Sequence, residues 1–398
     1  MSKLTELERI PRRIGAAPPH QFRKIGGRML MTRATGEYAF LDKSRPAWSE
    51  RSSPISWRGP SRHHVCLENK NGILSPETAR GVVNFIFSIP SPTTEIELSG
   101  RSWPALRFIV QYARRKSEWY SRPLSLLCRI DSRFGEDELR FLAGHRVTPA
   151  FELDTDNAGT PLDFRGLDGG RLSAVLAAGK GRLRAWVGEK PADPSRLVDA
   201  WRSQGISSVR LEPKPSLKKL NLFFRFYETA LDRMIAAGTP EAGKIKEERA
   251  EAFLRLILPL DLKYPTLPGL DILAELAYDP RGRIYTGSAG LDLSQDDCDL
   301  FHLGEIGSSR YQELGANPLV QTLLAAMEPS HQPLCFQCSY KPYCSLSPSI
   351  NFQEQKTIWG DAISSLQCSL HMGILDRLFA RLAKKDGREI LQDWLAPR

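Results

Sequence analysis

The sequence lacks any long run of apolar residues. No stretch of 18 or more apolar residues occurs among its 398 residues, so no membrane-spanning helix is expected. The first fifteen residues mix acids and bases and contain no apolar segment of signal-peptide length. We therefore expect a cytoplasmic protein, whose cysteines stay reduced rather than paired in disulfides.

The sequence also lacks recognisable nucleic-acid-binding motifs. Lysine and arginine outnumber aspartate and glutamate, 55 against 46, which gives a net charge of +9. No basic stripe interleaved with aromatics, no zinc-finger histidine pair and no helix-turn-helix signature accompanies this charge. We interpret the charge as a solvated surface or a face for an acidic partner, and expect neither nucleic acid nor a membrane as partner.

Cysteine is scarce, but four of the seven cysteines lie near the C-terminal end. Cys335, Cys338 and Cys344 lie in the segment CFQCSYKPYC, and Cys368 follows after a spacer of mixed polarity. Two residues between the first pair allow both thiolates of a tight turn to face one metal site. Four sulfurs suit zinc or an iron–sulfur cluster, and buried reduced thiols are the structural alternative.

The other candidate ligands stand alone. Cys128 falls in a predicted strand, where a buried thiol is the usual role, and Cys298 lies among aspartates and is expected to be exposed. His63 and His64 precede a predicted strand edge. We assign both histidines a structural role, because no acidic partner is identifiable nearby.

Strand and helix patterns alternate between residues 73 and 237. The expected strands are 95–98, 124–130, 150–153, 182–187 and 209–212, and the expected helices are 76–87, 104–116, 136–143, 194–204 and 217–237. Such alternation is typical of parallel β/α units with right-handed crossovers. Five or six units are fewer than the eight of a complete barrel, so the sequence predicts an α/β fold with a partial (β/α)6-type TIM-like barrel.

Together these features resemble radical S-adenosylmethionine (SAM) enzymes with a C-terminal SPASM domain, most closely the peptide maturases of the His-Xaa-Ser system. The resemblance spans roughly residues 20–385, and its motifs are FRKIGGR (22–28), RHHV (62–65), LSPET (74–78), LAYDP (276–280), LG (303–304), YKPYC (340–344) and the Cys368 region. It implies three regions. These are an N-terminal hairpin and linker arm (1–62), a degenerate radical SAM partial barrel (63–240), and a SPASM-like cysteine-rich iron–sulfur domain ending in a helix (241–398).

The sequence departs from the family at the SAM site. The family holds its radical cluster with a CX3CX2C motif after the first barrel strand, where this chain has only Cys66. A cubane needs three or four thiolates. The family's Gly-Gly-Glu-Pro segment, which helps to seat SAM, corresponds to Gly100-Arg101-Ser102-Trp103. We therefore expect no SAM cofactor, no reductive SAM cleavage, and no catalytic residues of that chemistry.

One of the family's two auxiliary clusters is also missing. Its cysteine positions correspond to Gly269, Gly287 and Ser347, and Gly282 remains at the turn. The ligands of the other auxiliary cluster correspond to Cys335, Cys338, Cys344 and Cys368. The resemblance therefore implies one 4Fe-4S cluster on these four cysteines, with zinc as the alternative metal.

The resulting prediction is a pseudoenzyme, namely a degenerate radical SAM/SPASM protein that acts as a scaffold or partner subunit in RiPP-like peptide maturation. Its expected partners are an active radical SAM maturase, a precursor peptide, or both. One alternative is a zinc-binding interaction protein. Another is an enzyme with new, non-SAM chemistry in the barrel mouth, because acids lie on or just after predicted strands, namely Asp131, Glu152, Asp154 and Glu212. Convergence of these acids in one pocket would favour the enzyme, whereas a pocket plugged by Trp103 or Phe151 would not.

Overall fold

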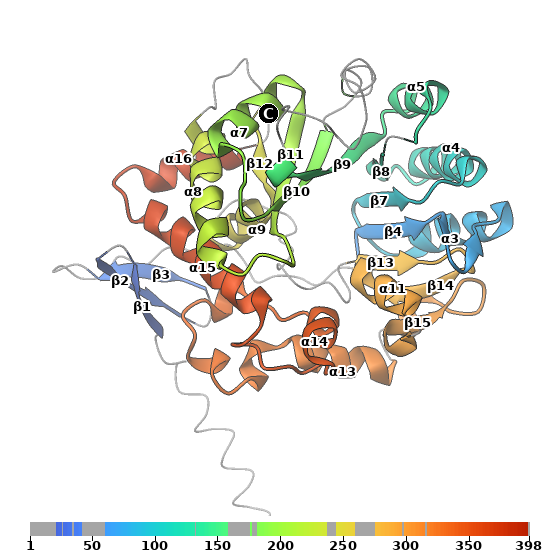
Figure 1. Ribbon diagram of the computed structural model, residues 1–398. Coiled ribbons are helices and arrows are strands. Elements are labelled where there is room, and N and C mark those ends of the chain that lie inside the picture. The colour runs from blue at the N-terminus through green and yellow to red at the C-terminus, as the bar shows by residue number, and fades with distance from the viewer. Residues whose placement is uncertain are drawn as a thin grey trace, which may run out of the picture.

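The computed structural model describes most of the chain, and every structural statement below concerns that part. The described residues are 21–25, 27–33, 36–41, 60–131, 133–157, 176, 181–236, 244–258, 275–296, 298–314 and 317–396. Figure 1 shows a curved sheet with helices α3, α4 and α5 outside one arm, helices α7 and α8 outside the other, and the C-terminal helices across its open side.

Six parallel strands form a partial barrel. They pair in chain order, and they are β4 (Arg62–Cys66), β7 (Thr94–Ser99), β8 (Leu124–Arg129), β9 (Thr148–Asp154), β10 (Gly181–Val187) and β11 (Ile206–Pro213). Their connections contain α3 (Pro76–Ser88), α4 (Trp103–Trp119), α5 (Glu136–Gly144) and α7 (Pro194–Ser203), and α8 (Leu220–Ala236) follows β11. The α/β fold with a (β/α)6-type partial barrel is therefore confirmed.

Local sequence signals explain where these elements begin and which face they bury. Helix α3 begins at the predicted Ser-Pro-Glu signal, where the Ser75 side chain accepts a hydrogen bond from the Thr78 backbone N–H at 3.1 Å. The barrel strands alternate buried with half-buried residues, as in β7, where Ile96 and Leu98 pack outward against helices. Full burial of each such side chain contributes about 1.5–3 kcal/mol. The other face of each strand, which carries polar residues, lines the barrel lumen.

The C-terminal part extends the same sheet. Strand β13 (Glu275–Tyr278) pairs in parallel with β4, and the antiparallel strands β14 (Arg283–Thr286) and β15 (His302–Glu305) follow. The predicted turn between β13 and β14 depends on buried Asp279, which accepts hydrogen bonds from the backbone N–H groups of Arg281 and Arg283 at 2.9 Å each. Gly282 in this turn has a φ of +85°, which favours glycine.

Helices complete the C-terminal part. Their bounds are α9 (Glu248–Ile257), α11 (Gly287–Gln295), α12 (Tyr311–Leu314), α13 (Pro318–Met327), α14 (Pro348–Gln355), α15 (Leu366–Leu382) and α16 (Gly387–Leu395), and the short strand β12 (Lys246–Glu247) precedes α9. The sequence also predicts that 374–391 is largely helical with basic residues outside. Helices α15 and α16 confirm the helical part of this prediction. Arg381 departs from it, because it is buried and pairs with Asp232 of α8 at 2.6 Å.

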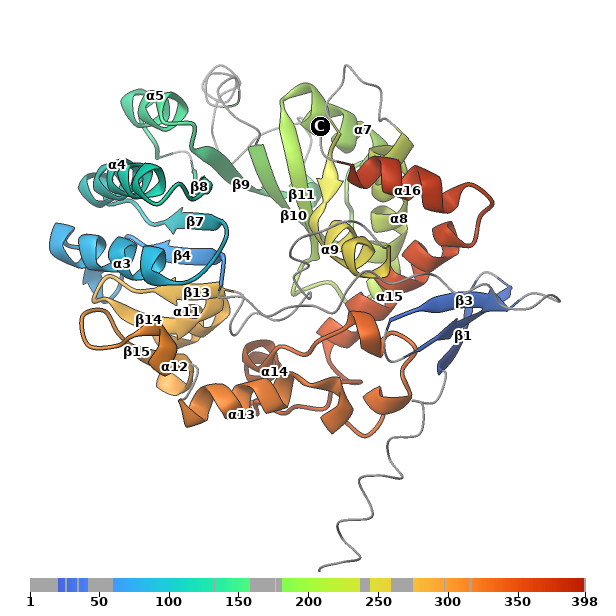
Figure 2. The same ribbon diagram turned by 180° about the vertical axis from the view of Figure 1, so that it is seen from behind.

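A small antiparallel sheet lies at the N-terminal end. It contains the predicted hairpin, β2 (Arg28–Thr32) and β3 (Tyr38–Leu41), and one additional strand, β1 (Gln21–Ile25). Figure 2 shows this sheet beside α15. Arg23 of β1 donates to both oxygens of Asp376 on α15, at 2.6 and 2.7 Å, which links the two ends of the chain.

Some predictions concern residues outside the described ranges. The expected linker arm lies mostly within 42–59, and the position of Gly269 lies within 259–274. The three-region division of the chain stays a prediction. None of the described helices is long and apolar enough to cross a membrane.

Candidate functional site

The four candidate metal-ligating cysteines line one cavity in the C-terminal part. Cys335 begins the 3-10 turn η4 (Cys335–Gln337), and Cys338 follows directly after it. Cys344 follows η5 (Lys341–Tyr343), and Cys368 lies in the first turn of α15. Mostly apolar side chains complete the wall, namely Pro329, Tyr340, Lys341, Leu346, His371, Met372 and Leu375. The structure thus brings the four thiols together, and their role as ligands stays a prediction.

The cysteine spacing follows from a series of three-residue turns. Backbone N–H groups donate from Cys338 to the Cys335 carbonyl at 3.0 Å, from Lys341 to Cys338 at 3.1 Å, and from Cys344 to Lys341 at 3.3 Å. Side chains three residues apart lie on one side of a 3-10 turn, so this geometry accounts for the CX2CX5C spacing. Cys368 is placed by the helix cap, where the Ser365 hydroxyl accepts from its backbone N–H at 3.0 Å.

Burial keeps three of the thiols, Cys335, Cys344 and Cys368, neutral when no metal is bound. It raises the pKa of Cys335 to about 11, with a further contribution from Cys368. Burial, and then the charge of neighbouring Cys338, raises the pKa of both Cys344 and Cys368. A coordinating thiol is deprotonated outright, so the cavity suits a cationic group that would stabilise several thiolates at once.

His371 is a further polar residue at this cavity that the sequence reasoning missed. Its Nδ1 lies 3.4 Å from the Cys344 sulfur, and its ring packs edge-on against Phe253. Burial lowers the His371 pKa to about 3, so the ring is neutral and can donate one N–H. The available signal was its position three residues after Cys368, which places both side chains on one helix face.

The remaining cysteines lie elsewhere. Cys66 ends β4, is buried against Ala277, Tyr285 and Leu291, and donates to the Glu68 carbonyl at 3.3 Å. Cys128 is buried in β8, as predicted. The prediction that Cys298 is exposed was wrong, because its backbone bond to Leu293 carries it against the core, where it is half-buried.

The loops after β4 and β7 pack tightly against each other. Leu67, together with the short strands β5 (Glu68–Asn69) and β6 (Gly72–Ile73), leads from Cys66 towards α3. Gly100, in the loop after β7, has a φ of +94°, and a Cβ there would lie 2.8 Å from the Glu68 backbone nitrogen. A side chain at position 100 would therefore clash with the backbone of the loop after β4.

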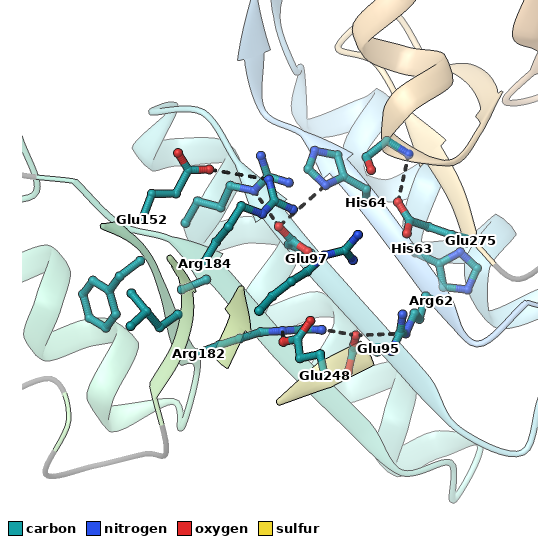
Figure 3. A pocket seen from close by; sticks show the side chains of 16 residues that line it. Arg62, His63, His64, Glu95, Glu97, Glu152, Arg182, Arg184, Glu248 and Glu275 are labelled. Carbon is teal, nitrogen blue, oxygen red and sulfur yellow. Dashed lines mark hydrogen bonds and ion pairs between the residues drawn. The ribbon is translucent and has the colours of Figure 1, made fainter. Parts of the chain in front are cut away.

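The barrel lumen is densely charged. Figure 3 shows the side chains lining a cavity of about 100 Å³ in which five arginines and five glutamates occur, namely Arg62, Arg129, Arg182, Arg184 and Arg210 with Glu95, Glu97, Glu152, Glu248 and Glu275. A complete barrel interior is typically filled by branched apolar side chains. This lumen is therefore a polar chamber, and not a packed core.

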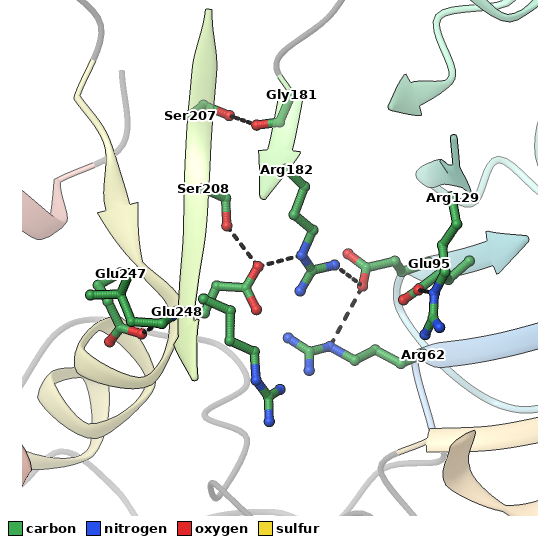
Figure 4. A network of polar contacts seen from close by, with 12 residues as sticks. Arg62, Glu95, Arg129, Gly181, Arg182, Ser207, Ser208, Glu247 and Glu248 are labelled. Atoms are coloured by element: carbon green, nitrogen blue, oxygen red, sulfur yellow. Dashed lines mark hydrogen bonds and ion pairs between the residues drawn. The ribbon is translucent and has the colours of Figure 1, made fainter. Parts of the chain in front are cut away.

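One network closes the lower lumen, nearer the N-terminal ends of the strands. Arg182 of β10 pairs with Glu248 and, across the lumen, with Glu95 of β7 at 3.4 Å. Glu95 also pairs with Arg62 at 3.6 Å, and Glu248 accepts from the Ser208 hydroxyl at 2.8 Å (Figure 4). We call these five residues the floor network.

The upper lumen contains a second polar group. Arg129 donates to Glu97 at 2.5 Å, and Arg184 faces Glu152 at 3.6 Å. Burial raises the pKa of Glu97, but the charge and hydrogen bond of Arg129 outweigh this and hold that pKa at about 2. The missed signal was the two-residue spacing of charges within the strand sequences, which places them on the lumen face.

The two histidines have different surroundings. His63 points outward, with Nδ1 3.1 Å from the Tyr278 hydroxyl, which is a structural contact. His64 lies within β4 rather than before it, its Nε2 is 2.8 Å from the Ser99 hydroxyl, and its Nδ1 is 4.0 Å from Glu97. The prediction that no acid lies near His64 was wrong, because parallel register aligns His64 with Glu97.

The four strand-end acids do not converge on one pocket. Asp131 and Glu152 line a pocket of about 160 Å³ at the barrel mouth, together with Phe151. Asp154 instead binds Lys214 at 2.6 Å, and Glu212 pairs with Arg210 and Arg249 at 2.6 Å each. Trp103 packs edge-on against Phe141 and thus fills space between helices. The convergence of all four acids, which would have favoured an enzyme with new chemistry in the barrel mouth, does not occur.

Solved structures with a related fold are known. No protein-family model and no curated protein matches the sequence. Native anSMEcpe with bound AdoMet matches with a TM-score of 0.58 at 11% identity, over 80% of this chain and 97% of that chain. The anSMEcpe complex with AdoMet and Cp18Cys peptide matches with a TM-score of 0.59 at 11% identity, over 81% and 98%. Streptococcus suis SuiB bound to S-adenosylmethionine matches with a TM-score of 0.53 at 12% identity, over 76% of each chain.

These structural matches define the class of the fold. They extend over the barrel and into the part that follows it, because each covers at least three quarters of this chain. The chain has a radical SAM/SPASM-like fold.

Proposed function

We propose that this protein is a degenerate radical SAM/SPASM protein that binds one auxiliary-type 4Fe-4S cluster and serves as a scaffold or partner subunit in RiPP-like peptide maturation. The observation that carries the proposal is a contrast between two sites. Four thiols line one cavity in the C-terminal part, whereas the end of the first barrel strand offers only Cys66.

The donor set consists of four thiols that line one cavity. Four thiolates can hold an iron–sulfur cluster or a single zinc ion. The resemblance of the four cysteine positions to an auxiliary cluster site favours the cluster in this proposal. Such a cluster would join η4, η5 and the start of α15 and could exchange one electron.

The barrel mouth supports the loss of SAM chemistry. Cys66 is buried in an apolar cluster, and the loop at Gly100 packs closely against the Glu68 backbone. Arg101, in the segment that corresponds to the family's SAM-binding loop, donates to the Arg133 carbonyl at 2.9 Å. In this correspondence Ser102 stands in place of the acid that the family uses, and Arg101 stands in place of a glycine.

A peptide precursor or an active maturase is the partner that we propose. One anSMEcpe structure holds the Cp18Cys peptide and another holds the Kp18Cys peptide, so a fold of this kind can present a peptide-binding surface. Without SAM chemistry, the barrel would hold or present the peptide rather than modify it.

Anaerobic reconstitution with iron and sulfide tests the proposal. We expect about four irons per chain, absorbance near 400 nm, and no 5′-deoxyadenosine after addition of SAM and a reductant. Two or three clusters, release of 5′-deoxyadenosine, or stoichiometric zinc in place of iron would each contradict it.

A further inference from the structure

We propose that the upper barrel lumen is a binding site for a carboxylate group, with the Arg184 guanidinium as its main donor and His64 as a second donor. The group would belong to an acidic peptide side chain or to a small organic acid. The proposal does not rest on the cluster, because its residues lie on barrel strands and none lines the four-cysteine cavity.

The first observation is the unused hydrogen-bonding capacity of Arg184. Among the described residues, Glu152 is the only acid that pairs with it, and their closest N–O distance of 3.6 Å is too long for a hydrogen bond. About a third of the Arg184 side chain is exposed, and it faces the cavity. A guanidinium presents donors in a planar fork that matches both oxygens of a carboxylate.

The second observation is a buried donor on the opposite wall. Only 6% of the His64 side chain is exposed, and its Nδ1 has no hydrogen-bond partner among the described residues. If the Ser99 hydroxyl donates to Nε2, then Nδ1 carries the proton and requires an acceptor. Figure 3 shows His64, Glu97 and Arg184 directed towards the same space. A carboxylate between Arg184 and His64 would supply the missing acceptor.

The pairing of charges singles out Arg184 in the upper lumen. Arg129 pairs with Glu97 at 2.5 Å and Arg210 pairs with Glu212 at 2.6 Å, whereas Arg184 faces Glu152 at 3.6 Å. The lower part contains Arg62 and Arg182 with Glu95, Glu248 and Glu275, and its members pair with one another or with backbone N–H groups. A single carboxylate could therefore bind Arg184 without disturbing the floor network.

The size of the site limits the ligand. The lumen cavity of about 100 Å³ adjoins the mouth pocket of about 160 Å³, because Arg129, Phe151 and Glu152 line both. Typical sites for drug-sized ligands measure about 300–1,000 Å³. The lumen therefore fits a carboxylate on a short carbon chain that enters from the mouth.

Isothermal titration of the reconstituted full-length protein tests the site with defined probes. N-acetylglutamate amide represents a peptide side chain, propionate represents a free small acid, and N-acetylglutamine amide is the neutral isostere. We expect both carboxylates to bind and the isostere not to bind. Tighter binding of the amino-acid probe assigns the site to peptides, and tighter binding of propionate assigns it to small acids. Absence of binding by both carboxylates overturns the proposal.

Two substitutions with opposite expected effects exclude simple misfolding as an explanation. Arg184→Gln removes the planar guanidinium and its paired donors, and it should weaken carboxylate binding at least about tenfold. Glu152→Gln removes the competing carboxylate and should tighten binding, and Arg140→Gln, on the exposed face of α5, should have no effect. Unchanged affinity in Arg184→Gln, or weaker binding in Glu152→Gln, overturns the proposal. Iron content is measured on each variant, so failure here leaves the proposed cluster intact.

Discussion

Cys344 follows the 3-10 turn η5, and its sulfur lies 3.4 Å from Nδ1 of His371. Cys344→Ser should remove one ligand of the proposed cluster, so iron and visible absorbance after reconstitution should fall to a small fraction of the wild-type values. Cys298→Ser is the matched control, because Cys298 lies outside the cavity and is half-buried against the core. Equal iron loss in both variants would contradict the assignment.

His371 should tune the proposed cluster rather than hold it. If the neutral His371 ring carries its proton on Nδ1, it donates to the Cys344 sulfur and stabilises the added negative charge of the reduced state, because hydrogen bonds to cluster sulfurs affect the potential. His371→Leu should therefore lower the reduction potential while four irons are retained. An anaerobic redox titration followed by electron paramagnetic resonance measures this, and His371→Gln should restore part of the shift. An unchanged potential would exclude the hydrogen bond.

At the scale of elements, helix α15 provides the fourth cysteine, and its first turn depends on Ser365. Replacing this cap by alanine removes the acceptor for the Cys368 N–H and should reduce the free energy of unfolding by about 1 kcal/mol. Chemical denaturation of the metal-free protein measures the change. Ser365→Asn, which retains a capping oxygen, should behave nearly as wild type; a loss equal to that in Ser365→Ala would indicate packing rather than capping.

In the barrel strands, the alternation of residues along each strand decides which side chains face the lumen. Charges two residues apart, as in Glu95 and Glu97 or Arg182 and Arg184, all reach the lumen, whereas the apolar residues between them pack outward. The curved sheet therefore collects charges from distant parts of the chain in one chamber. Only their partners, and not their direction, depend on strand order.

At the scale of the whole molecule, stability should fall in acid. Burial raises the pKa of Glu212, but Arg249 and Arg210 outweigh it and hold that pKa at about 2, as Arg129 does for Glu97. A carboxyl with a depressed folded-state pKa stabilises the protein above its unfolded value of about 4.5 and loses this contribution as pH falls towards 2. Burial raises the pKa of Glu247, so protonation of Glu247 favours the folded state and partly offsets this loss of stability in acid.

The free energy of unfolding, measured between pH 6 and pH 3 (about the range set by these shifts), should therefore decline with acid. Glu212→Gln should be less stable at neutral pH, because Arg210 and Arg249 lose their shared partner, but its pH dependence should be shallower. If the free energy of unfolding changed with pH by the same amount in both proteins, the pKa of Glu212 would not be lowered in the folded state.

Binding of the proposed cluster should also stabilise strand β1 of the N-terminal sheet. Asp376 on α15 binds Arg23 of β1 and accepts from the Tyr340 hydroxyl at 2.5 Å, next to the cysteine turns. Because metal binding stabilises the folded state, hydrogen exchange should slow on reconstitution in residues 335–344, in the start of α15, and in β1. Arg23→Met should remove the effect in β1 alone. A hydrogen-exchange rate in β1 that is the same before and after reconstitution would contradict this coupling.

The sequence by itself determined the elements and their order. Hydrophobic periodicity, the Ser-Pro-Glu helix start and the strand–helix alternation act over a few residues, so they predicted the partial barrel and the N-terminal hairpin with its turn. The cysteine spacing likewise predicted a shared site, since turns of three residues are local.

Tertiary structure alone decided which charges meet. Arg182 pairs with Glu95 although 87 positions separate them, and His64 meets Ser99 only because β4 and β7 pair in parallel register. The same long-range packing carried Cys298 inward and buried Arg381 against α8. Such contacts depend on how the strands pair and how the helices pack, which no local sequence pattern encodes. The lumen could therefore be identified as a candidate binding site only from the tertiary structure.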